Sequence, residues 1–91
     1  MPDSESREVR IKRLNMRSMR PGIKEMDIIL TRYAGARLAA LSDAQLDHYD
    51  LLLAENDQDI YQWVTGQVDP PARFAGLISD ISGLAHMPAR R

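Results

Sequence analysis

An apolar residue recurs at every third or fourth position from Ile23 to Leu41, and this repeat limits the possible folds more than any other feature. At 100° per residue, these positions fall on one stripe of an α-helix. The stripe comprises Ile23, Met26, Leu30, Tyr33, Ala34, Leu38 and Leu41. We therefore predict a helix over about 22–40 that buries this face. The small residues 34–36 within it predict the close approach of a neighbouring helix.

Capping residues place a third helix after this one. Ser42 is a typical N-cap, and Gln45 three residues later completes a capping box. Leu41 and Leu46 occupy the positions of a hydrophobic staple around that cap. An earlier helix is predicted over about 6–19, although its apolar residues spread over two sides.

A short fourth helix is predicted after the loop at 55–57. Its N-cap is Asn56 or Asp57, and Gly66 is the expected stop. Trp63 is interpreted as a core anchor, with an interface role as the alternative. A fifth helix is expected to start with Asp69 as cap and Pro70 in the first position, and to end at Gly83.

The predicted fold class is therefore all-α: a small five-helix bundle in a single domain, 1–91. Residues 1–5 and 86–91 are polar or lack a period, and we expect disordered tails there. The apolar residues expected to be buried include Leu30, Tyr33, Leu53, Trp63 and Phe74.

Few residues could carry catalysis or hold a metal. The chain has no Cys, and its two His residues have no partners that suggest a catalytic role. His48 is expected on the surface. Asp43, Asp47 and Asp50 have spacings that could chelate a hard cation, but no carbonyl-bearing loop accompanies them. The glycines match no nucleotide-binding pattern. We expect no enzyme activity, no metal site and no stably bound cofactor.

Charge is distributed unevenly along the chain, although the net charge is −1. Residues 1–24 carry seven Lys/Arg against three Asp/Glu, whereas residues 25–63 carry two against eight. This pattern favours either attraction within the molecule or steering toward a partner protein. A small helical DNA-binding or antitoxin-like regulator is an alternative function, because the first helix is basic. The acidic middle of the chain argues against it.

The start of the second helix combines exposed charge with glycine. Glu25 points roughly 200° away from Ile23, so it has no evident packing role. Asp27 lies at the edge of the core stripe and needs a partner there. It either pairs with an arginine of the first helix or favours the helix dipole, or it contacts a binding partner. Gly22 is either a left-handed residue or a bare surface for another chain.

This segment resembles a known signature. Arg20, Gly22 and Glu25 resemble the Arg-Gly-x-x-Glu signature of the small FAD assembly factors of succinate dehydrogenase. The resemblance covers about residues 10–66. Here Pro21 stands where the family has arginine, so Arg20 lies one position earlier.

The resemblance implies a non-enzymatic factor that binds the flavoprotein subunit of succinate dehydrogenase and promotes its covalent FAD attachment. The related subunit of fumarate reductase is a second candidate partner. The implied partner-binding residues are Arg20, Gly22, Lys24, Glu25 and Asp27. FAD would be attached to the partner, and no nucleic acid is expected.

No apolar run reaches the ~20 residues of a membrane span, so no membrane insertion is expected. The first residues contain no secretory signal and are too few for a transit peptide. We expect a bacterial cytoplasmic protein that is a monomer when free.

Overall fold

A computed structural model describes residues 6–85 of the chain, and these residues form helices and no strand. The helices are α1 (Arg7–Ser18), α2 (Lys24–Arg37), a 3-10 turn η1 (Leu38–Ala40), α3 (Asp43–Leu53), α4 (Asp57–Val64) and α5 (Ala72–Ala85). The predicted all-α fold with five helices is confirmed. The tails predicted at 1–5 and 86–91 lie outside the described residues.

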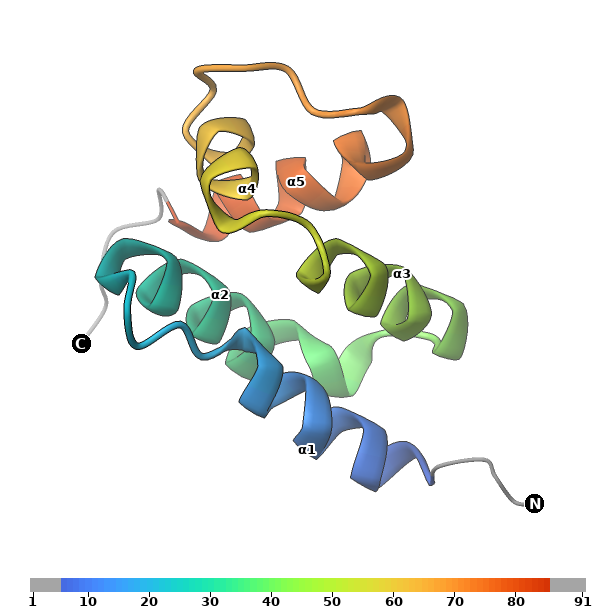
Figure 1. Ribbon diagram of the computed structural model, residues 1–91. Coiled ribbons are helices and arrows are strands. Elements are labelled where there is room, and N and C mark those ends of the chain that lie inside the picture. The colour runs from blue at the N-terminus through green and yellow to red at the C-terminus, as the bar shows by residue number, and fades with distance from the viewer. Residues whose placement is uncertain (1–5, 86–91) are drawn as a thin grey trace.

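Helix α2 lies at the centre of the arrangement. It packs against α1 on one side and against α5 on another, while α1 also packs on α3 and α4 on α5. Figure 1 shows α1 at the bottom of the view and α4 and α5 at the top, with α2 and α3 between them. The loop that joins α1 to α2 lies on the outside of the bundle (Figure 1).

The predicted stripe of α2 forms much of the core. Met26, Leu30, Tyr33, Ala34 and Leu38 are all buried. Ile23 is 37% exposed, because it is the N-cap residue and its extended backbone lies outside the helical register.

The predicted close approach of a neighbouring helix at residues 34–36 is wrong for Gly35 and Ala36. Gly35 and Ala36 are exposed, and a Cβ added at Gly35 would meet no atom within 4 Å. Only one of the three small residues faces a neighbour.

The local capping signals are confirmed. Ser42 and Gln45 form both hydrogen bonds of the capping box. Asn56 is the N-cap of α4, where its side chain accepts a hydrogen bond from the Gln58 N–H. Gly66 follows the end of α4 with a φ of 83°, the left-handed conformation that glycine adopts at low cost.

Both predicted ends of α5 are wrong. The helix starts at Ala72 rather than Pro70, because Pro71 disfavours helical backbone in the residue before it. Gly83 does not stop the helix, which continues to Ala85. Leu84 and Ala85 pack against the core, and this contact extends the helix beyond the glycine.

The remaining core joins all five helices. Leu53 and Phe74 are buried as predicted, and Trp63 is partly buried with its ring centroid 6.2 Å from that of Phe74. His48, predicted to be a surface residue, is half-buried with its ring 5.2 Å from Phe74. No helix within residues 6–85 is both long and apolar enough to cross a bilayer.

Candidate functional site

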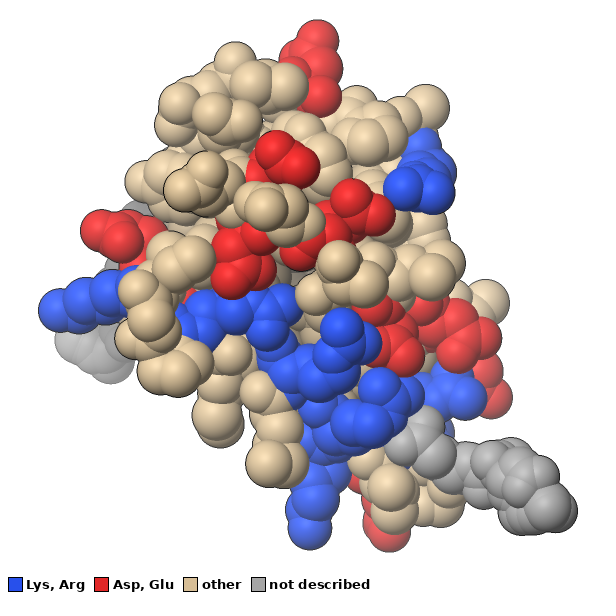
Figure 2. All heavy atoms as spheres, in the orientation of Figure 1, with Lys and Arg blue, Asp and Glu red and all other residues tan. Residues whose placement is uncertain are grey.

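The basic residues of α1 form ion pairs with the acidic residues of α3. Figure 2 shows Lys and Arg side chains gathered beside a band of Asp and Glu. The pairs are Arg7–Asp43 at 3.1 Å, Arg10–Asp47 at 2.5 Å, Arg13–Asp50 at 3.2 Å and Arg17–Asp50. We call this series the α1–α3 ladder. It supports the interpretation of the uneven charge as attraction within the molecule.

The ladder bears on two interpretations of the sequence, a DNA-binding surface on the first helix and a cation site at three aspartates. The arginines face aspartates rather than solvent alone, so they do not form a free basic surface for phosphates. The DNA-binding alternative therefore gains no support. Asp43, Asp47 and Asp50 each bind an arginine, and no group of three His, Asp or Glu within residues 6–85 is placed to hold a metal ion.

The loop between α1 and α2 is fixed at both of its sides. The Asp27 carboxylate accepts a hydrogen bond of 2.8 Å from the backbone N–H of Arg20. The Arg20 guanidinium donates to the Asp57 carboxylate and to the Leu53 carbonyl, each at 3.0 Å, and also to the Arg17 carbonyl. The loop is thus tied to α2 by backbone and to α3 and α4 by a side chain.

Arg20 and Asp27 therefore have structural roles in this loop. The Arg20 side chain is only 18% exposed, and its guanidinium points toward α3 and α4. Asp27 has the loop-pinning role that a carboxylate at the core edge requires, although its partner is the backbone of Arg20 rather than a guanidinium.

Gly22, Lys24 and Glu25 are exposed at the tip of this pinned segment. Gly66 is the only residue with positive φ in the described chain, so the left-handed interpretation of Gly22 is excluded. A Cβ added at Gly22 would meet nothing within 4 Å. The bare-surface interpretation is the one that remains.

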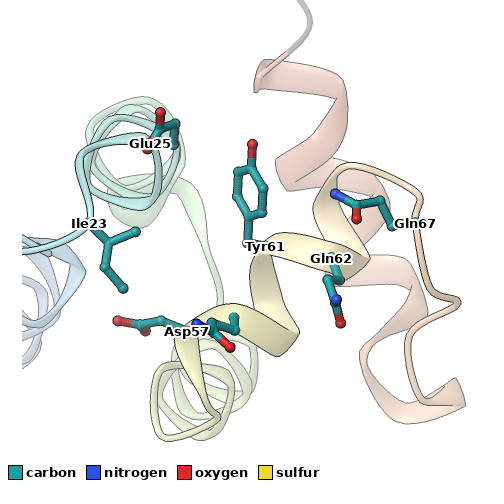
Figure 3. A pocket seen from close by; sticks show the side chains of 7 residues that line it. Ile23, Glu25, Asp57, Tyr61, Gln62 and Gln67 are labelled. Carbon is teal, nitrogen blue, oxygen red and sulfur yellow. The ribbon is translucent and has the colours of Figure 1, made fainter.

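Glu25 lies at the edge of a hollow between the start of α2 and α4. The hollow has a volume of about 450 Å³. Its lining residues are Ile23, Glu25, Asp57, Gln58, Tyr61, Gln62 and Gln67. In Figure 3 the Tyr61 ring stands between Glu25 on one side and Gln67 on the other. Within the described residues, the Glu25 carboxylate makes no hydrogen bond or ion pair.

The sequence did not identify most of these lining residues as part of a site. The local pattern marks Asp57 as a possible helix cap and assigns no role to Tyr61 or Gln67. Their position next to Glu25 depends on packing between α2 and α4, which are more than 30 residues apart in the chain at these points. No local pattern encodes such a contact.

The fold and this surface define a class: a small helical protein in which exposed groups lie on a loop held in place by side-chain hydrogen bonds. A family model described as "Flavinator of succinate dehydrogenase" matches residues 12–85. This chain belongs to that family, which confirms the family resemblance seen in the signature.

Curated relatives agree with this assignment. "Succinate dehydrogenase assembly factor 2, mitochondrial" of Mycosarcoma maydis is 40% identical over 84 residues, which cover 92% of this chain and 35% of that protein. The protein of the same name from Meyerozyma guilliermondii is 49% identical over 65 residues, covering 71% of this chain and 48% of that protein. The chain thus spans half or less of the length of these relatives.

The expected bacterial cytoplasmic localisation is contradicted by these comparisons. The relatives are fungal proteins, and their names describe them as mitochondrial. The prediction had relied on the short N-terminal lead, which is a poor guide to localisation.

Proposed function

We propose that this protein binds the flavoprotein subunit of succinate dehydrogenase and promotes the covalent attachment of FAD to it. The related subunit of fumarate reductase is a second candidate partner. Membership of the family and the assembly-factor names of the relatives support this proposal. The protein would act as a monomer in a one-to-one complex.

One structural observation carries the proposal: Glu25 presents a carboxylate that has no hydrogen bond or ion pair among residues 6–85, on a segment held at both sides. Its neighbours are fixed by the Asp27 and Asp57 contacts with Arg20. A pre-organised contact loses less conformational entropy on binding, which favours affinity. An exposed acid without contacts to the described part of the chain is also the type of residue that can change partner binding without changing the fold.

The protein would assist attachment without contributing a reacting group. The bond would form between the flavin and residues of the flavoprotein. This protein would hold the flavoprotein in a competent conformation and so raise the population of that state.

The protein would not bind FAD itself. FAD carries a pyrophosphate, and the described residues that line the hollow next to Glu25 include two carboxylates and no Lys or Arg. Like charges disfavour that combination. Equilibrium dialysis of FAD against the protein alone is expected to show no retention, and retention at micromolar FAD would contradict this part of the proposal.

The test is flavinylation of the purified apo-flavoprotein, followed by covalent flavin fluorescence after denaturing electrophoresis. The wild-type protein should accelerate attachment, and Glu25→Ala should lose most of that effect. Glu8→Ala is the matched control, because Glu8 is also an exposed acid on a helix. Both variants should unfold within about 0.5 kcal/mol of wild type. Full activity of Glu25→Ala would contradict the proposal.

A further inference from the structure

The hollow between α2 and α4 has the chemistry to receive a cation. Its lining residues provide the Glu25 carboxylate, the Asp57 carboxylate, the Tyr61 phenol and the side-chain carbonyls of three glutamines. Among the described residues, none that lines the hollow is Lys or Arg. Arg20 approaches one oxygen of Asp57 at 3.0 Å, and Glu25 forms no ion pair with any residue in the range 6–85.

The shape of the hollow limits what can enter. A volume of about 450 Å³ is far larger than the share of one water molecule, about 30 Å³. One wall carries the aliphatic side chain of Ile23, which is 37% exposed, and the Tyr61 ring stands within the hollow (Figure 3). An occupant that combines an apolar stem with a charged, planar end would match these surfaces.

We infer that this hollow receives an arginine side chain of the flavoprotein subunit. The inference rests on the proposed function and adds the chemistry of one contact. Arginine offers five N–H donors in a planar fork, which suits the carboxylate and amide oxygens of the residues that line the hollow. Its guanidinium can also lie against the Tyr61 ring, and its methylenes can cover Ile23. Lysine would satisfy the charge but not the planar contacts.

The first experiment measures binding of the purified flavoprotein subunit to variants of the hollow. Glu25→Gln keeps the shape and removes the charge, and Gln62→Lys adds a cation to an exposed lining position. Each should raise Kd at least tenfold, about 1.4 kcal/mol. Glu25→Gln should also flatten the dependence of Kd on salt, because one charge pair is lost.

Matched controls separate the hollow from net charge. Asp59→Asn removes one negative charge from α4 outside the hollow, and Ala36→Lys adds one positive charge to an exposed position on α2. Both should bind within twofold of wild type. If these controls weaken binding as much as the hollow variants, or if the hollow variants bind like wild type, the inference is wrong.

The second experiment uses the protein without the flavoprotein. It therefore tests arginine binding in the hollow even if the wild-type protein does not bind that subunit. Acetyl-arginine amide is titrated to high millimolar concentration while side-chain NMR signals of Tyr61, Gln62 and Gln67 are followed. Acetyl-citrulline amide is the neutral control of the same shape. Shifts with arginine alone support the inference, and no shifts, or equal shifts with both probes, overturn it. Failure of flavoprotein binding with selective arginine shifts would reject the proposed function and keep the cation site.

Discussion

The side chain of Asp27 accepts a hydrogen bond from the backbone N–H of Arg20, seven residues earlier, at 2.8 Å. The first turn of α2 thereby closes the loop that leads into it. Because Gly22 to Glu25 lie between these two anchor points, the contact fixes the segment that carries the family signature. The position of Glu25 thus depends on a carboxylate that is itself largely structural.

Removing the Asp27 carboxylate should destabilise the fold. Asp27→Ala leaves the Arg20 N–H without its acceptor, and we expect a loss of about 1–3 kcal/mol in the free energy of unfolding. Asp27→Asn should cost less, because its amide oxygen can still accept. Urea unfolding measures both, with exposed Asp69→Ala as the control, expected within about 0.5 kcal/mol of wild type. Equal stability of Asp27→Ala and the control would contradict a pinning role.

Arg20→Ala should reduce stability and partner binding together. The substitution removes hydrogen bonds to Asp57 and Leu53 and leaves Asp57 without its cation, so we expect a loss of about 1.5–3 kcal/mol. Binding should weaken at least tenfold because the loop that presents Glu25 loosens. Arg37→Ala is the control, since Arg37 is exposed at the end of α2. Weakened binding with unchanged unfolding would instead make Arg20 a direct partner contact.

The two ends of the α1–α3 ladder should differ in strength. Asp50 binds two arginines and its side chain is 30% exposed, whereas Asp43 binds Arg7 with its side chain 81% exposed. Asp50→Ala should therefore cost about 1–2 kcal/mol, and Asp43→Ala less than about 0.5 kcal/mol. Added NaCl should narrow the difference between them. Thermal unfolding at low and high salt provides the measurement, and equal costs at low salt would refute the ranking.

Alkaline pH should weaken the fold through Tyr49. Burial is the main cause that raises the pKa of the Tyr49 phenol to about 12. Ser18 donates its proton to the Leu14 carbonyl, so the phenol donates to Ser18 across 2.6 Å. The folded state holds that proton more tightly than the unfolded state, whose tyrosine pKa is about 10.

Stability from this group is therefore complete below pH ~10 and is lost as the pH rises toward 12. A two-unit difference corresponds to about 2–3 kcal/mol. Unfolding free energies measured from pH 8 to 12 should fall less steeply in Tyr49→Phe than in wild type. A residual slope is expected in that variant, because burial also raises the pKa of Tyr33. Parallel pH profiles for the two proteins would show that Tyr49 does not contribute.

Features encoded within a few residues were readable from the sequence. Ser42 with Gln45, and Gly66 after α4, lie at the caps that were predicted for them. These signals arise from backbone groups at most a few residues away, so no tertiary contact is needed to interpret them. The start of α5 at Ala72 is encoded just as locally, because Pro71 disfavours helical backbone at Pro70.

The site was only partly readable, because its contacts join distant segments. The outward direction of Glu25 followed from helical periodicity, and its exposure is confirmed. The inward direction of Arg20 did not follow, because Asp57 lies 37 residues later and only the packing of α3 and α4 brings it close. The hollow beside Glu25 was invisible for the same reason.

The α1–α3 ladder also helps to fix the position of α1 along the axis of α3. The arginines of α1 pair with the aspartates of α3 in the same chain order, so the two helices run parallel. The pairs are Arg7–Asp43, Arg10–Asp47 and Arg17–Asp50. A slip by one helical turn, about 5.4 Å, would bring the last of these arginines level with Ala54 instead of an acid. A slip in this direction would therefore be electrostatically poorer than the native arrangement, because Arg17 would lose its ion pair with Asp50. The charges of α1 thus help to fix its position along α3. They thereby also fix the start of the loop that carries Arg20 and Gly22.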